Sequence, residues 1–292
     1  MAVRMTAVAG QFYEASPKAC RTQIEQLLPG GPVRGALPDR IMAGIVPHAG
    51  WVFSGDLAAL VFAAVKQLQP VDTFVIFGAV HTAAARTGLL YDSGQWGTPL
   101  GIIDIDEELC AAIRAESGDL IHADRSAHSR EHSIEVQVPF IQYLFETARI
   151  VPLLVPPLAS AHRIGEAVAR AIALSDKQVV CIGSTDLTHY GPGYRHTPMG
   201  SGPVALRWAK DTNDRFFIDL ALALQADKLV ESAALYGNAC GAGAAAAAIA
   251  AAKQLGAKKG YLLAHTTSAE VMAQKYGSSS EDSVGYAAIV FG

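Results

Sequence analysis

Residues 41–50 read IMAGIVPHAG, an apolar run of strand length that ends in proline, histidine and glycine. Apolar residues at consecutive positions are typical of a strand that is buried on both faces of a sheet. TFVIFGAVH at 73–81 repeats this arrangement, and QVVCIGSTDLTH at 178–189 is a third apolar run that leads into polar residues. The three runs predict buried strands of one central sheet over residues 41–47, 73–78 and 178–183, each followed by side chains that can carry chemistry.

The rest of the chain alternates between helical and apolar stretches, which predicts an α/β fold. Because several strands are apolar on both faces, we expect a central sheet covered by helices on both sides. The region 87–105 has no helix between its strands and predicts antiparallel pairing, so the sheet is expected to be mixed. No linker or repeat divides the chain, and we predict one domain over residues 1–292. The further expected strands are 87–91, 101–105, 150–155, 259–264 and 284–290, and the expected helices are 55–68, 107–115, 133–145, 159–174, 212–224 and 240–255.

Composition excludes several classes of protein. The net charge of −4 gives no basic excess, which argues against a nucleic-acid or anionic-membrane partner. The Ala-rich run 241–253 is shorter than the roughly 20 residues that a bilayer needs, and the N-terminus has no apolar core of signal-peptide length. The four cysteines form no CxxC pair. We therefore expect a cytoplasmic protein with free thiols.

Three histidines, His48, His81 and His189, follow the predicted strands directly or within one short turn. Sites in such folds form outside the carboxyl ends of the strands. Neutral imidazoles in a cluster are the usual ligands of Fe, Zn or Cu. A single histidine after a strand is more often a structural residue, but three at comparable ends favour a metal site.

Other polar residues leave two interpretations open. Asp186 precedes His189 by three residues, so on a helical turn it would orient that imidazole or act as acid or base, unless it is only an N-cap. Cys240 precedes the Ala-rich helix, whose N-terminus favours thiolate; the alternative is a small buried hydrophobe.

A dense polar cluster stands at 130–135. Glu131, His132 and Glu135 are candidate pocket residues, with both glutamates on one face of a predicted helix. An acidic helix start that complements the helix dipole is the alternative. His122 and His128 lie just upstream, and the sequence leaves open whether their loop closes over the site.

Seven motifs follow one another along nearly the whole chain: PHAGWVFSG (47–55), FGAVHT (77–82), WGTPLG (96–101), EHSIEVQVPF (131–140), STDLTHYG (184–191), NACG (238–241) and SVGYAA (283–288). As a set they resemble the Memo family, which includes system protein B of the AmmeMemoRadiSam group. The resemblance implies a fold similar to class III, LigB-type extradiol dioxygenases. It also implies His48, His81 and Cys240 as metal ligands, with Asp186 and His189 beside them. Trp51 stands where tyrosine is commoner, which would alter one pocket wall.

Two imidazoles and one anionic ligand suit a non-haem Fe(II) centre with open positions, with Cu or Zn as alternatives. A thiolate in place of the usual carboxylate makes redox chemistry with dioxygen or superoxide the leading hypothesis, rather than ring cleavage. His189 would then move a proton, oriented by Asp186. The alternatives are a non-catalytic module that binds a metal, a small molecule, a peptide or a partner protein, and a metal-assisted hydrolase.

Overall fold

Four parallel strands form the centre of the computed structural model, which describes residues 2–82 and 84–292. They lie in the order β2 (Ala43–Val46), β9 (Val179–Ser184), β3 (Thr73–Gly78) and β8 (Arg149–Leu154). Every residue of β2, β3 and β9 is buried. Burial on both faces explains why these segments are apolar at consecutive positions.

Antiparallel strands extend this core on both sides into a nine-stranded mixed sheet. Strand β12 (Ser283–Phe291) pairs antiparallel with β2 and carries β10 (His189–Tyr190) and β11 (Gly260–Thr267). On the other side β4 (Gly88–Leu90) is antiparallel to β8, and β7 (Ile121–Ala123) follows it. The predicted mixed sheet is confirmed. A separate small sheet joins β1 (Val3–Arg4), β5 (Gln95–Thr98) and β6 (Gly101–Asp104).

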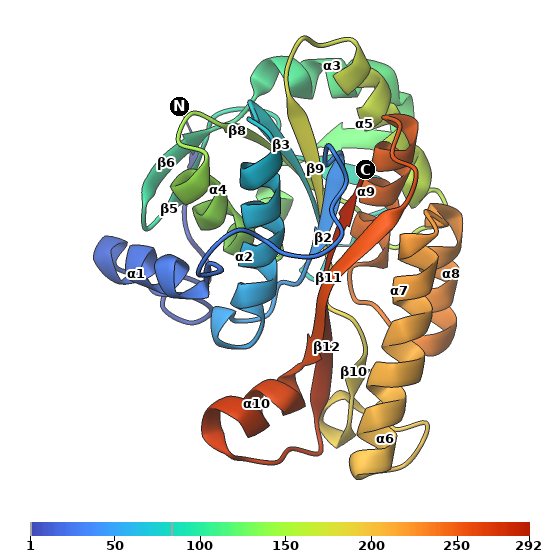
Figure 1. Cartoon of the computed structure of the whole chain (residues 1–292). Helices are drawn as coiled ribbons and strands as arrows, with labels where there is room; N and C mark the ends of the chain where they lie inside the picture. The colour runs from blue at the N-terminus through green and yellow to red at the C-terminus, as the bar shows by residue number, and fades with distance from the viewer. Residues whose placement is uncertain (1, 83) are drawn as a thin grey trace.

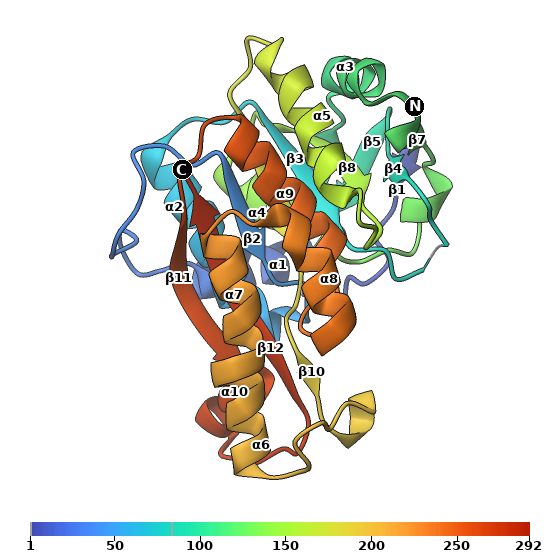
Figure 2. The ribbon, with the colours of Figure 1, turned by 90° about the vertical axis from the view of Figure 1, so that its right-hand side faces the viewer.

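Helices cover both faces of the large sheet, as predicted (Figures 1 and 2). One layer contains α1 (Pro17–Leu27), α2 (Trp51–Leu68) and α4 (Val138–Leu144). The other contains α5 (Ala161–Ala173), α7 (Arg215–Leu222), α8 (Ala226–Tyr236) and α9 (Ala242–Gln254). Helix α3 (Glu107–Ser117) packs on α5, α6 (Pro203–Trp208) leads toward α7, and α10 (Ser268–Tyr276) packs beside β12.

Helix α2 is long and apolar enough to cross a membrane by length and composition alone. However, 56% of it is buried inside the protein, where it packs on the sheet, as in the core helix of a soluble protein. The Ala-rich α9 is also a core helix. It packs so closely on α5 that a Cβ on Gly165 would lie 2.0 Å from the carbonyl oxygen of Ala247.

Several expected elements differ from the structure. The helix predicted from residue 133 begins as a 3₁₀ turn, Glu135–Gln137, and becomes α-helical at Val138. The helix predicted from residue 212 begins at Ala209 as a π-helical segment, Ala209–Asp214, before α7. Helices α1, α6, α8 and α10 were not predicted, and α10 buries only Val271. A helix that buries so little has no apolar periodicity to detect.

Candidate metal centre

Three neighbouring parallel strands end at one place and bring the predicted residues together. His48 follows β2, Asp186 follows β9 and His81 follows β3, and these strands are adjacent in the sheet. The carboxyl ends of parallel strands meet at the same edge, so side chains distant in sequence converge there. Cys240 reaches this edge from the segment before α9, with its backbone N–H donating to the carbonyl of Asp186 at 3.3 Å.

The ring of His48 is held in one tautomer. Its Nδ1 lies 3.0 Å from the hydroxyl oxygen of Ser184, and that hydroxyl donates its only hydrogen to the carbonyl of Ser133 at 2.8 Å. Ser184 must therefore accept from the Nδ1–H of His48. The Nε2 atom is left with a free lone pair, which is the form of imidazole that binds a metal ion.

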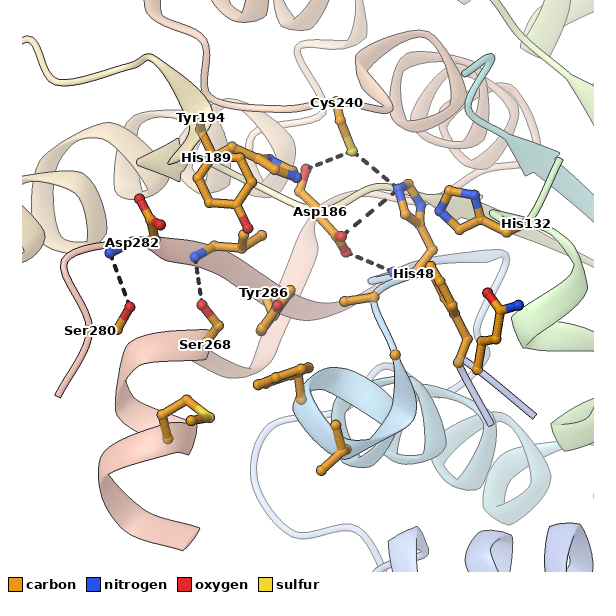
Figure 3. A pocket seen from close by; sticks show the side chains of 18 of the residues that line it. His48, His132, Asp186, His189, Tyr194, Cys240, Ser268, Ser280, Asp282 and Tyr286 are labelled. Carbon is orange, nitrogen blue, oxygen red and sulfur yellow. Dashed lines mark hydrogen bonds and ion pairs between the residues drawn. The ribbon is translucent and has the colours of Figure 1, made fainter. Parts of the chain in front are cut away.

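The free Nε2 atom of His48 faces a thiol and a carboxylate (Figure 3). It lies 3.2 Å from the Sγ of Cys240 and 3.9 Å from Oδ2 of Asp186. The other oxygen of Asp186 accepts the backbone N–H of His48 at 2.7 Å. Oδ1 of Asp186 thus fixes the backbone of His48, while Oδ2 of Asp186 lies near Nε2 of the same histidine.

Burial decides the protonation of this group. Desolvation, together with the neighbouring histidines, holds the pKa of His48 well below its ordinary value. Desolvation also raises the pKa of Asp186 and, with added repulsion from Asp186, that of the Cys240 thiol. The helix N-terminus was expected to favour thiolate at Cys240, and this expectation is wrong because burial outweighs it. A metal ion that binds Cys240 must displace the thiol proton.

Glu131 fixes His81 by accepting two hydrogen bonds from it. Its Oε2 accepts the backbone N–H of His81 at 2.8 Å, and its Oε1 accepts Nδ1–H at 3.0 Å. Burial lowers the pKa of His81, but the hydrogen bond and charge of Glu131 outweigh it, and the net direction is upward. Glu131 itself is buried and its pKa is lowered, because hydrogen bonds from His81 and Ser133 outweigh the desolvation that raises it. Glu131 orients an imidazole whose Nε2 is free.

The ligand atoms fall into two groups that could hold a metal ion. One group is His48, Asp186 and Cys240, and the other is His48, His81 and His132; within each group the atoms lie within 4.8 Å of one another. His48 belongs to both. The predicted set of His48, His81 and Cys240 therefore draws on both groups.

His189 is placed differently from the prediction. Its Nδ1 donates to the carbonyl of Leu187 at 3.1 Å, and no hydrogen bond or ion pair joins it to Asp186 in the part of the chain that the structure describes. The two residues do not share a helical turn, because residues 185–188 are irregular and His189 begins β10. Asp186 thus orients His48 rather than His189. The Nε2 of His189 has no hydrogen-bond partner among the residues that the structure describes.

These residues form the base of an open pocket of about 760 Å³. Its wall combines apolar side chains with hydroxyls and one further carboxylate, Asp282, at the outer end (Figure 3). Among the residues that the structure describes, no lysine or arginine lines it. The wall includes Phe12, Phe53, Tyr194, Ser268, Met272, Ser280 and Tyr286. Of these, Phe53 on α2 and Tyr286 on β12 lie in quoted motifs; the others come from loops and from α10, which gave no sequence signal.

Several predicted pocket residues belong to the core instead. Trp51 is buried on Tyr13 and Phe140, and its Nε1–H donates to the carbonyl of Val136 at 3.0 Å, so it forms no pocket wall. Glu135 is buried away from the pocket, where it forms an ion pair with Arg4. Glu131 and Glu135 do not share a helical face, because only Glu135 lies in the 3₁₀ turn.

The upstream histidines do not close over the site. His122 lies on β7 at the edge of the sheet. His128 is fully buried, and its Nε2 lies 2.9 Å from the carbonyl of Leu89. Neither lines the pocket.

The fold and the strand-end cluster define an α/β protein with a candidate metal pocket at the carboxyl edge of a mixed sheet. The model of the Memo-like protein family matches residues 4–290, and the chain belongs to this family. A MEMO1 family protein of Methanopyrus kandleri is 37% identical over 99% of this chain and 98% of its own length. MEMO1 family proteins of Thermococcus onnurineus and Pyrobaculum aerophilum are 37% and 34% identical, over 99% and 100% of this chain and 99% of each relative.

A solved structure shares the fold. The crystal structure of an uncharacterized protein, JW3007, from Escherichia coli K12 matches with a TM-score of 0.52 at 13% identity, covering 87% of this chain and 100% of that one. At this identity the likeness shows the fold alone. The similarity to LigB-type dioxygenases stays a prediction.

Proposed function

We propose that the chain binds one metal ion, Fe(II), through His48, His81 and Cys240, and uses it for redox chemistry with dioxygen or superoxide. The observation that carries the proposal is the fixed tautomer of His48, whose free Nε2 lies 3.2 Å from the Cys240 sulfur at the base of an open pocket. Cu and Zn are the alternative metals, because thiolate suits Cu(I) and imidazole suits both.

The donor set fits a metal ion. Ser184 and Glu131 each take the Nδ1–H of one histidine, so that Nε2 remains as the ligand atom. Such outer hydrogen bonds are typical of metal-bound histidines. No lysine or arginine among the described residues lines the pocket, so no protein cation neutralises Asp186 or a Cys240 thiolate there.

A bound metal of this kind supplies a redox centre with coordination positions that the protein does not fill. The chain supplies the surroundings. His189 faces the same pocket with a free Nε2, which can take up or return a proton, and the ring of Tyr194 packs edge-on against it at 5.0 Å. Phe12, Phe53 and Met272 give the pocket an apolar wall.

A second candidate function is binding without catalysis. The pocket extends from the histidines to Ser280 and Asp282, which is more room than a metal ion and a diatomic ligand need. A small molecule, a peptide or a segment of a partner protein would occupy the outer part. For either function we propose a cytoplasmic location, where free Cys20, Cys110, Cys181 and Cys240 stay reduced.

Oxygen consumption separates the two functions. The protein is loaded with Fe(II) without oxygen, then mixed with dioxygen or superoxide, and consumption is followed. We expect the rate of consumption, with the bound Fe(II) as the electron donor, to exceed that of free Fe(II) and to fall roughly 10²- to 10⁴-fold in His189→Asn, the usual size of a general acid–base contribution. The matched control is His122→Asn, on the exposed edge strand. Bound iron without any consumption would contradict the redox function and favour binding alone.

A further inference from the structure

His132 stands beside the proposed ligands but is not one of them. Its ring stacks on that of His81, with centroids 4.9 Å apart and planes at 20°, and lies edge-on to His48 at 5.4 Å. Phe12 packs on it at 4.9 Å. In the described part of the chain, the His132 ring forms no hydrogen bond with another protein group. A partly buried imidazole that is fixed by packing and faces two ligand histidines has its nitrogen free for a ligand.

We propose that His132 is an alternative third ligand, so that a metal ion can be held by His48, His81 and His132 without Cys240. The inference rests on the proposed metal site and adds to it. The ligand atoms of the three imidazoles lie within 4.8 Å of one another, the same limit that holds for His48, Asp186 and Cys240.

The carboxylate of Glu131 accepts a hydrogen bond from His81 and lies at ion-pair distance from His132. Oε1 of Glu131 lies 3.0 Å from Nδ1 of His81 and 3.6 Å from Nδ1 of His132. The hydroxyl oxygen of Ser184 accepts the Nδ1–H of the third ring, that of His48. All three imidazoles therefore have a polar group on the Nδ1 side, which leaves Nε2 for the metal.

The two ligand sets are alternatives. Both use Nε2 of His48, and one nitrogen lone pair binds one metal ion. The sets differ in one ligand atom, because one contains the soft sulfur of Cys240 and the other contains a third imidazole nitrogen. Loss of the thiol therefore leaves three imidazoles that can still hold the metal ion.

Co(II) is the probe that distinguishes the sets, because a cobalt–thiolate bond gives an intense near-ultraviolet charge-transfer band that imidazole ligands do not. The binding constant and the spectrum are measured for wild type, Cys240→Ala, His132→Ala and the double variant. Cys240→Ser repeats the thiol removal with a side chain of similar size, and His122→Ala is the control for losing an imidazole elsewhere. Circular dichroism checks that each variant is folded.

We expect Cys240→Ala and Cys240→Ser to bind one Co(II) per chain with a dissociation constant within about 10-fold of wild type and without the band. Adding His132→Ala should weaken binding by at least about 100-fold, the upper end of what an outer-shell loss costs. The proposal is overturned if either cysteine variant binds no cobalt, or if the double variant binds as well as Cys240→Ala. A wild-type protein that binds no metal, or a His48→Ala variant that binds as tightly as wild type, would instead contradict the metal site itself.

Discussion

The carboxylate of Glu131 accepts two hydrogen bonds from His81, one from the backbone N–H at 2.8 Å and one from Nδ1–H at 3.0 Å. The two residues are 50 positions apart in sequence. This contact fixes both the position of the loop after β3 and the tautomer of the imidazole. Glu131 is therefore a positioning residue for the metal centre, although it does not line the pocket.

Glu131→Gln tests this role. The amide keeps the shape of the side chain but loses the charge and one of the two acceptors, so His81 is no longer held in one tautomer. We expect metal affinity to fall roughly 10- to 100-fold, as for other outer-shell partners. Competition with a chromophoric chelator measures it. Glu146→Gln, an exposed residue, is the control, and equal affinities in the two variants would contradict the role.

Glu135 has a structural role instead. It pairs with Arg4 and accepts hydrogen bonds from Tyr13 and from the backbone of Ala7 and Val8, tying the N-terminal segment to the protein. Glu135→Gln leaves Arg4 buried without its counterion, which typically costs about 3–5 kcal/mol. We expect denaturant unfolding to show a loss of this order, with one metal per chain retained.

A surface pair provides the comparison. Glu116→Gln removes the exposed pair with Arg170 and should cost about 0–1 kcal/mol. If Glu135→Gln costs no more than Glu116→Gln, the anchoring role is wrong.

Gly285 must be glycine because of Asp214. A Cβ at Gly285 would lie 2.0 Å from Oδ2 of Asp214, whose other oxygen accepts the N–H of Thr188 at 2.9 Å. Thr188 lies between Asp186 and His189, so this contact positions the polar end of the site. We expect Gly285→Ala to destabilise the protein by about 1–3 kcal/mol, as overpacking does, and to weaken metal binding.

Gly30→Ala is the matched control, since no atom lies within 4 Å of its Cβ position. That change should stay within about 0.5 kcal/mol, as at most surface sites. A Gly285→Ala protein with wild-type stability and metal affinity would show that Asp214 does not need its present position.

His128 makes stability depend on pH. Burial lowers its pKa to about 4 from the model-compound value of 6.5. The unfolded chain thus binds the proton more tightly, so the full contribution of His128 is present above pH 6.5 and is lost as pH falls toward 4. The difference corresponds to roughly 3 kcal/mol, at about 1.36 kcal/mol per pKa unit.

Denaturant unfolding at pH 7.5 and pH 4.5 measures this loss. His128→Gln cannot titrate and should lose less stability between the two values than wild type does. An equal loss in both proteins would assign the acid sensitivity to other groups, such as His48.

The sequence was most informative where burial leaves a pattern. The apolar runs before His48 and His81 predicted β2 and β3, and the strand-end rule brought those histidines together. Prediction from the sequence failed where the site depends on contacts between distant segments. Nothing in the spacing indicated that Glu131 turns toward His81 while Glu135 turns toward Arg4, because a turn rather than a regular helix separates them.

The residues of the outer pocket could not be predicted from the sequence either. Tyr194 and Asp282 come from irregular segments whose paths depend on tertiary packing. Asp186 was expected to orient His189 from one helical turn, but the chain after β9 is irregular and its carboxylate reaches His48 instead. Periodicity predicts which face of a regular element is buried, and it carries no information about a side chain on an irregular one.

The central claim is that His48 and His81 hold a metal ion at the carboxyl edge of the sheet. Anaerobic purification followed by metal analysis, with anomalous scattering at the iron edge from a crystal, tests it most directly. We predict about one iron per chain, as a single site of this type requires, with the anomalous peak beside Nε2 of His48. Metal-free protein, or a His48→Ala/His81→Ala variant that retains the same iron content, would contradict the claim.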